Sequence, residues 1–146
     1  MYSKQLLSLE DARIVGEAAL AKAMENSDRP MAIAVGDATG ELVYFVKMDT
    51  ARPLFPKMAM NKVHTAIHFG RDTTEVGPYL QADGKGVSDF GDPRFTTIPG
   101  GVCLKASDGT VLGAIGTSGR YPKIDEITDL EVALAGAQAL SLSKGN

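Results

Sequence analysis

Two glycine-rich segments constrain the fold of this chain more than any other feature. The first, residues 98–102, reads Ile-Pro-Gly-Gly-Val, and the second, residues 113–119, reads Gly-Ala-Ile-Gly-Thr-Ser-Gly. The turn signal Ser107-Asp108-Gly109 lies between them, so the pattern predicts a β-hairpin. Glycines at strand ends let the backbone approach a neighbour or a ligand closely. The pattern therefore predicts a pocket floored by main chain, with side chains supplied by other elements.

The remaining elements are predicted from apolar spacing, caps and turn residues. Strands come in hairpins rather than alternating with helices, which favours an antiparallel sheet with helices packed against it, an α/β (α+β) fold. In chain order we expect a helix capped by Ser8, strands over 31–35 and 42–46, a helix over 57–70, a short helix over 73–80, a loop over 81–97, strands over 102–105 and 110–115, and a last helix from near Pro122.

Composition indicates one domain spanning residues 1–146. The chain is 44% hydrophobic and 23% charged, with a net charge of -3 and scattered basic residues, so we expect no nucleic-acid partner. No apolar run is long enough to cross a bilayer, and the N-terminus lacks a secretory pattern. Cys103 is the only cysteine, which favours a reducing, cytoplasmic location and an inert buried thiol.

Four motifs resemble those of the GlcG/HbpS-like, or haem-degrading domain, family. Their order and spacing match that family over about residues 32–139. The motifs are Met48-Asp49-Thr50-Ala51 followed by Ala59, Lys62, Thr65 and Ala66; Phe69-Gly70-Arg71; Pro99-Gly100-Gly101-Val102; and residues 111–119 followed by Asp125-Glu126.

This resemblance implies a profilin-like fold, an antiparallel sheet flanked by helices, and assembly into homodimers or larger homo-oligomers. It also implies that the ligand is haem or a related tetrapyrrole, and haem is the only cofactor it suggests. Phe55 stands where the family usually has serine, and Cys103 stands where proline often follows the Pro-Gly-Gly-Val motif. A bulky Phe55 is expected to reshape the pocket.

His64 and His68 are the only histidines, and they lie four residues apart on the predicted second helix. Side chains at this spacing share a helix face, so the pair could hold a metal with Asp49 or Asp125 as a third ligand. A haem iron could instead take one of the two rings. The alternative is a solvated or subunit-facing side of the helix.

Lys62 and Asp125 are the candidate acid/base residues. A partly buried lysine can bind a carboxylate or move a proton, because desolvation lowers its pKa. The alternative for Lys62 is a structural ion pair with Asp49 or Asp125. Asp125 is expected either to cap the last helix or to face the same cavity as Lys62.

Two functional hypotheses follow, together with a third, purely structural or regulatory role. The first is a ligand-binding protein that holds a small acidic molecule or a tetrapyrrole between the second helix and the glycine-rich edges. The alternative is a cofactor-independent isomerase, tautomerase or lyase acting on a small oxo-acid or ring-cleavage product, in which backbone amides stabilise an enolate. Besides Lys62, the expected ligand contacts are Asp49, Thr65, Pro99, Gly100, Gly101, Ser118 and Gly119.

Overall fold

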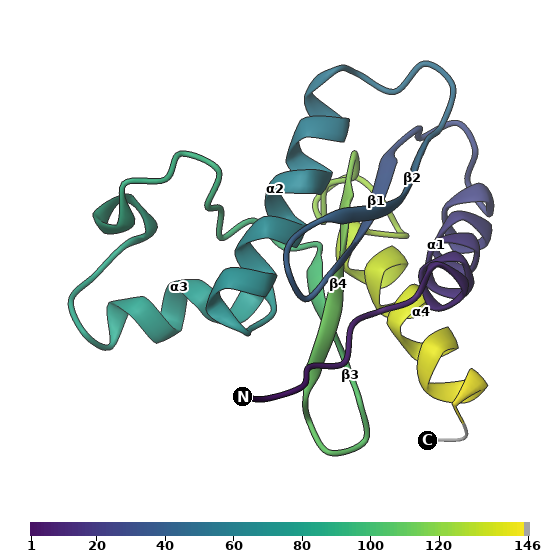
Figure 1. Ribbon diagram of the computed structural model, residues 1–146. Helices are drawn as coiled ribbons and strands as arrows, with labels where there is room; N and C mark the ends of the chain where they lie inside the picture. Colours follow the sequence, from purple (N-terminus) through teal and green to yellow (C-terminus); the bar gives the residue numbers. More distant parts are fainter. Residues whose placement is uncertain (145–146) are drawn as a thin grey trace.

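The computed structural model describes residues 1–144 and shows an α+β fold built on one four-stranded sheet (Figure 1). The strand order is β2-β1-β4-β3, and every neighbouring pair is antiparallel, as the hairpin pattern predicts. The elements are α1 (Leu9–Met24), β1 (Ala32–Asp37), β2 (Leu42–Lys47), α2 (Leu54–Phe69), α3 (Thr73–Gln81), the 3₁₀ helix η1 (Val87–Phe90), β3 (Gly101–Lys105), β4 (Val111–Ser118) and α4 (Asp129–Ser143).

Helices cover both faces of the sheet. Helices α1 and α4 pack together on one face, and α2 lies on the other (Figure 1). Strand β1 shows why, because its side chains alternate between the two faces. Ile33 and Val35 belong to the core beneath α1 and α4, whereas Ala32 and Ala34 face α2. Small side chains on the second face let α2 approach the sheet closely.

Gly116 marks the closest contact between α2 and the sheet. A Cβ atom at this position would lie 2.0 Å from the backbone oxygen of Ala59, so only glycine fits. The glycine-rich run in β4 therefore serves helix packing in its middle and reaches the site only at its end. This tight contact fixes the position of Lys62, which lies one turn further along α2.

Helix α1 begins where its predicted cap, Ser8, places it, whereas α4 begins later than predicted. The Ser8 hydroxyl accepts a hydrogen bond from the Asp11 amide, and the Asp11 carboxylate accepts one from the Ser8 amide, which completes a capping box. The predicted start of the last helix near Pro122 is wrong. The helix begins at Asp129, where the Thr128 hydroxyl accepts from the Glu131 amide.

No helix within residues 1–144 combines the length and the apolar character needed to cross a membrane.

Candidate functional site

A cavity of about 390 Å³ lies where the sequence predicts a pocket, between α2 and the ends of the glycine-rich segments. Its walls are mostly apolar and include Leu54, Phe55 and Met58 from the first turns of α2, and Ile98 and Pro99 from the segment before β3. The rest of the wall comes from the end of β4, the loop that follows it and the first turn of α4.

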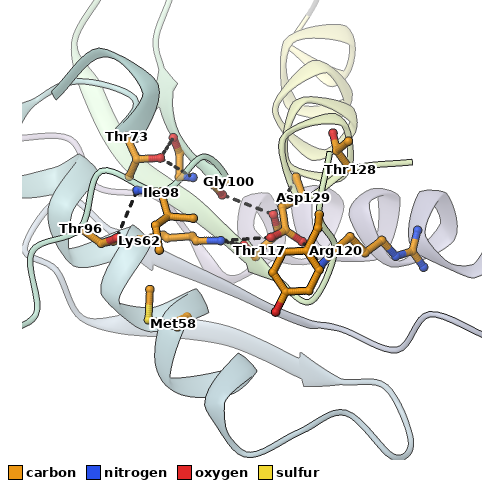
Figure 2. Close-up of polar contacts among 12 residues, drawn as sticks. Met58, Lys62, Thr73, Thr96, Ile98, Gly100, Thr117, Arg120, Thr128 and Asp129 are labelled. Carbon is orange, nitrogen blue, oxygen red and sulfur yellow. Dashed lines mark hydrogen bonds and ion pairs between the residues drawn. The ribbon is translucent and has the colours of Figure 1, made fainter. Parts of the chain in front are cut away.

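A buried ion pair lies at the wall of this cavity. Lys62 is 1% exposed, and its Nζ atom lies 3.2 Å from Asp129 Oδ2 and 2.6 Å from the Thr117 carbonyl oxygen (Figure 2). Burial lowers the pKa of Lys62 and raises the pKa of Asp129, while each partner's charge opposes the other's shift. Burial thus works against the charged form of each group, and the ion pair works in favour of it. The sequence predicts Asp49 or Asp125 as the ion-pair partner of Lys62. That prediction is wrong, because the partner is Asp129.

Gly100 makes room for the head of Lys62. Its φ is +125°, and a Cβ atom would lie 2.6 Å from the Thr117 oxygen and 3.0 Å from Lys62 Nζ. The amide of Gly101 donates to Thr73 Oγ1 at 3.0 Å. This bond corrects the expectation that the Gly101 amide would meet a ligand. The Pro-Gly-Gly motif thus shapes the lysine site instead of offering two free amides.

Asp125 lies in the loop before α4 and is not part of the helix, which corrects its predicted role as a cap. Arg29 donates two hydrogen bonds to its carboxylate, at 2.6 and 3.0 Å, and the Tyr121 amide donates a third at 2.9 Å. These bonds hold the pKa of Asp125 below its usual range, with the Arg29 hydrogen bond as the largest cause. The carboxylate is engaged away from Lys62 and does not line the cavity.

The other predicted contacts divide into two groups. Pro99, Ser118 and Gly119 line the cavity. Thr65 does not, because its hydroxyl donates to the Asn61 carbonyl and accepts from the Thr96 amide, which ties the 81–97 loop to α2. Asp49 is exposed and also lies outside the cavity wall.

The two histidines lie further along α2, and each lines a hollow other than the Lys62 cavity: His64 lies in a hollow with Met60 and Arg94, and His68 in a larger groove. His68 contributes to a groove of about 820 Å³ with Phe69, Tyr79, Leu80, Phe90 and Phe95. This groove shares no wall residue with the Lys62 cavity. Lys62 and His68 therefore line separate hollows, so a ligand in one of them would not contact both side chains.

Hydrogen bonds fix the protons on both imidazole rings. His68 Nδ1 lies 2.8 Å from the His64 carbonyl oxygen, and His64 Nε2 lies 2.7 Å from Asp92 Oδ2. The His64 and His68 ring centroids are 4.0 Å apart, and Phe95 stacks on His64 at 5.0 Å. Burial lowers the pKa of His64, and the hydrogen bond with Asp92 opposes that shift.

The two histidines lack the additional protein ligands that a metal ion without a porphyrin would need. Within residues 1–144, no group of three or more histidine, cysteine, aspartate or glutamate side chains could hold an ion. The predicted third ligand, Asp49 or Asp125, is elsewhere, and Asp92 is the acid beside His64. Cys103 is buried, as expected, and burial raises the pKa of its thiol to about 12.

A scan against protein families matches residues 7–138 to the family described as "Haem degrading protein HbpS-like". The chain belongs to this family. The resemblance inferred from the four motifs is confirmed. No curated protein matches the chain.

Several solved structures share the fold. The Klebsiella pneumoniae protein ORFY, of family DUF336, superposes with a TM-score of 0.81 at 22% identity, covering 97% of this chain and 94% of its own. A structure described as a PduOC:haem complex superposes with a TM-score of 0.78 at 24% identity, covering 92% of this chain and 94% of its own. A double mutant of Streptomyces reticuli HbpS superposes with a TM-score of 0.77 at 27% identity, covering 96% of this chain and 90% of its own.

Sequence reasoning missed Asp129 and the aromatic groove. A signal for Asp129 existed, because Thr128 and Glu131 have the spacing of a helix cap and place Asp129 in the first turn. No local pattern pairs Asp129 with Lys62, which is 67 residues away. The groove has no local signal either, since Phe90 and Phe95 reach α2 from a loop.

Proposed function

We propose that this protein binds a small ligand, and that the ligand is haem or a related tetrapyrrole. The family description names haem, and one protein of similar fold is described in complex with it. The question for this chain is whether its own residues fit such a ligand. The aromatic groove fits better than the Lys62 cavity.

The observation that carries this proposal is the hydrogen bond of His68. A carbonyl oxygen only accepts, so the ring nitrogen 2.8 Å from the His64 carbonyl must carry the proton. In the neutral ring this leaves the lone pair on Nε2. A histidine that ligates a metal commonly donates its other N–H in this way, which fixes the tautomer and ring orientation. If haem binds in this groove, His68 would be the residue that holds its iron.

The groove walls suit a flat apolar ring. Phe69 meets Phe90 and Phe95 edge to face, with centroids 5.2 and 4.9 Å apart. A hollow of about 820 Å³ lies in the upper part of the range for small-molecule and cofactor sites. Lys85 lines the groove, and the guanidinium of Arg71 stacks 3.9 Å above the Tyr79 ring. Lys85 pairs with Asp83 at 2.6 Å at the groove wall, and a haem carboxylate would compete with Asp83 for it.

The Lys62 cavity fits haem less well. It has about 390 Å³ and no histidine, and its candidate iron ligands are Met58 and Tyr121. When bound, haem supplies an iron centre for redox or oxygen chemistry. The role proposed for this chain is to hold the ring between aromatic side chains and to offer His68 Nε2.

A titration followed by absorbance tests this function. We expect haemin to bind saturably with one molecule per chain, with a shifted Soret band. Metal-free protoporphyrin should bind at least about tenfold more weakly, because it has no iron for His68. If haemin shows only unsaturable adsorption, or if both porphyrins bind equally, the proposal fails.

The enzyme alternative keeps one specific observation in its favour, the buried Lys62–Asp129 pair. A neutral Lys62 amine would take a proton from the carbon beside the carbonyl of an oxo-acid, and the ammonium so formed would return it to the enolate oxygen. Asp129 replaces Asp125 as the neighbouring carboxylate. The Gly101 amide cannot stabilise the enolate while it donates to Thr73.

Lys62→Met tests the enzyme alternative, with phenylpyruvate keto–enol conversion as the assay. We expect the variant to lose at least about a hundredfold in turnover, in line with the usual contribution of a general acid or base. Wild type should exceed the uncatalysed rate. Undiminished turnover in the variant would exclude Lys62 as the proton carrier.

A further inference from the structure

We infer that the Lys62 cavity is a second binding site, separate from the haem groove, and that it takes a small monocarboxylic acid with an apolar body. The inference does not depend on haem binding, because the two hollows share no wall residue. It goes beyond the proposed function by giving this cavity a ligand of its own.

Two helix N-termini converge on the cavity. The first turn of α2, which begins at Leu54, and the first turn of α4, which begins at Asp129, both form part of its wall. The unpaired amides of a first helical turn give that end a partial positive charge. No acidic residue lies in the first turn of α2. The first turn of α4 holds Asp129 and Glu131, and in α2 the Phe55 amide donates to the Arg52 carbonyl while Pro56 has no N–H, so the helix ends add only a weak preference for a negative group.

Side chains at the same wall have unused donors. The Lys62 ammonium has three protons, and only two acceptors, the Thr117 carbonyl and Asp129, contact it within residues 1–144. Ser118 is 6% exposed and lines the cavity, and its hydroxyl makes no hydrogen bond to the described part of the chain. No buried side-chain polar atom within residues 1–144 lacks a partner, so the Ser118 hydroxyl is open to the cavity, where a ligand oxygen can accept its proton.

The charges at the wall also leave room for an anion. Lys62 and Arg120 are both buried here, and Asp129 is the one carboxylate facing the cavity. The Arg120 side chain points away from Lys62 (Figure 2), and its guanidinium donates to the carbonyls of Ala23, Asn26 and Arg29. Because Asp129 pairs with Lys62 and Asp125 pairs with Arg29, the Arg120 charge beside the cavity has no carboxylate of its own. A single carboxylate balances it.

The rest of the cavity selects an apolar body of limited size. Leu54, Phe55, Met58, Ile98 and Pro99 supply hydrocarbon surface opposite the polar wall. A volume of about 390 Å³ lies near the lower limit for small-molecule sites. A short aryl or alkyl chain ending in a carboxylate matches both the surface and the volume.

Calorimetry with paired ligands tests this site. The probes are phenylacetate, phenylpyruvate and hexanoate, each paired with its neutral amide at the same pH. We expect at least one acid to bind with one molecule per chain and to raise the melting temperature, and its amide to bind at least about tenfold more weakly. If none of the acids binds, or if acid and amide bind equally, the inference is overturned.

Variants locate the bound acid. Ser118→Val removes the free hydroxyl and fills part of the cavity, and Lys62→Met removes the ammonium, so each should weaken the acid at least about tenfold. Asp49→Asn, an exposed change outside the wall, should leave binding unchanged. If Lys62→Met does not fold, Ser118→Val decides alone. Full affinity in a folded Ser118→Val variant would place the acid elsewhere. Haemin binding should be unchanged in Ser118→Val. The proposal for the acid site and the proposal for the haem groove are therefore tested separately.

Discussion

Gly100 has a positive φ and lies so close to the Thr117 oxygen that a side chain would not fit. The position of the Lys62 head depends on both features. The Gly100 φ of +125° is unfavourable for a side chain, and a Cβ atom would press on the Thr117 oxygen and Lys62 Nζ. The burial of the lysine could be predicted from the sequence. Its partner could not, because the sheet and α4 bring Asp129 to it from 67 residues away.

Gly100→Ala should destabilise the protein by about 2 kcal/mol or more, from backbone strain and from displacement of the lysine head. Urea unfolding measures this change. Gly86→Ala is the matched control, since its added Cβ meets nothing within 4 Å and its φ is -135°. The control should leave the free energy of unfolding within about 0.5 kcal/mol. Equal stability of the two variants would show that Gly100 is not constrained as described.

The loop between β4 and α4 is the element that sequence reasoning misjudged. The sequence here predicts the first turn of a helix, because proline and acidic residues are common at that position and this stretch contains Pro122, Asp125 and Glu126. In the structure this stretch instead forms part of the cavity wall, and Asp125 ties it to Arg29, the residue before Pro30 and β1. The hairpins and the α1 cap were predictable because their signals are local. This ion pair spans 96 residues and leaves no local signal.

The Arg29–Asp125 pair should make stability depend on pH. Hydrogen bonding by Arg29 holds the pKa of Asp125 below its usual range in the folded state, so the folded protein binds fewer protons there than the unfolded chain. Its contribution is therefore complete above the unfolded pKa and is lost as the pH falls through the folded value. Between about pH 5 and pH 3, wild type should lose more stability than Asp125→Asn, as measured by urea midpoints. Parallel losses in the two proteins would contradict this role.

At the scale of the whole molecule, one helix serves two hollows. The N-terminal turns of α2 border the Lys62 cavity, and its C-terminal turns carry His68 and Phe69 into the aromatic groove. The fold was predictable, and so was a hollow near the glycine-rich edges, although Gly100 and Gly101 do not line it and its walls are mostly side chains. The separation of the histidines from that pocket was not, because residue spacing along α2 does not show which surface the 81–97 loop covers. Assembly into a homodimer or larger homo-oligomer stays a prediction.

The most direct test of the central claim is the affinity of haemin for His68→Ala compared with His64→Ala. The alanine at position 64 keeps the backbone carbonyl that orients His68, so this control should retain affinity within about threefold and an unchanged Soret band. His68→Ala should lose at least about tenfold in affinity together with the wild-type spectrum, and added imidazole should restore that spectrum. If haemin binds His68→Ala with the affinity and spectrum of wild type, His68 is not the iron ligand and the groove is not the haem site.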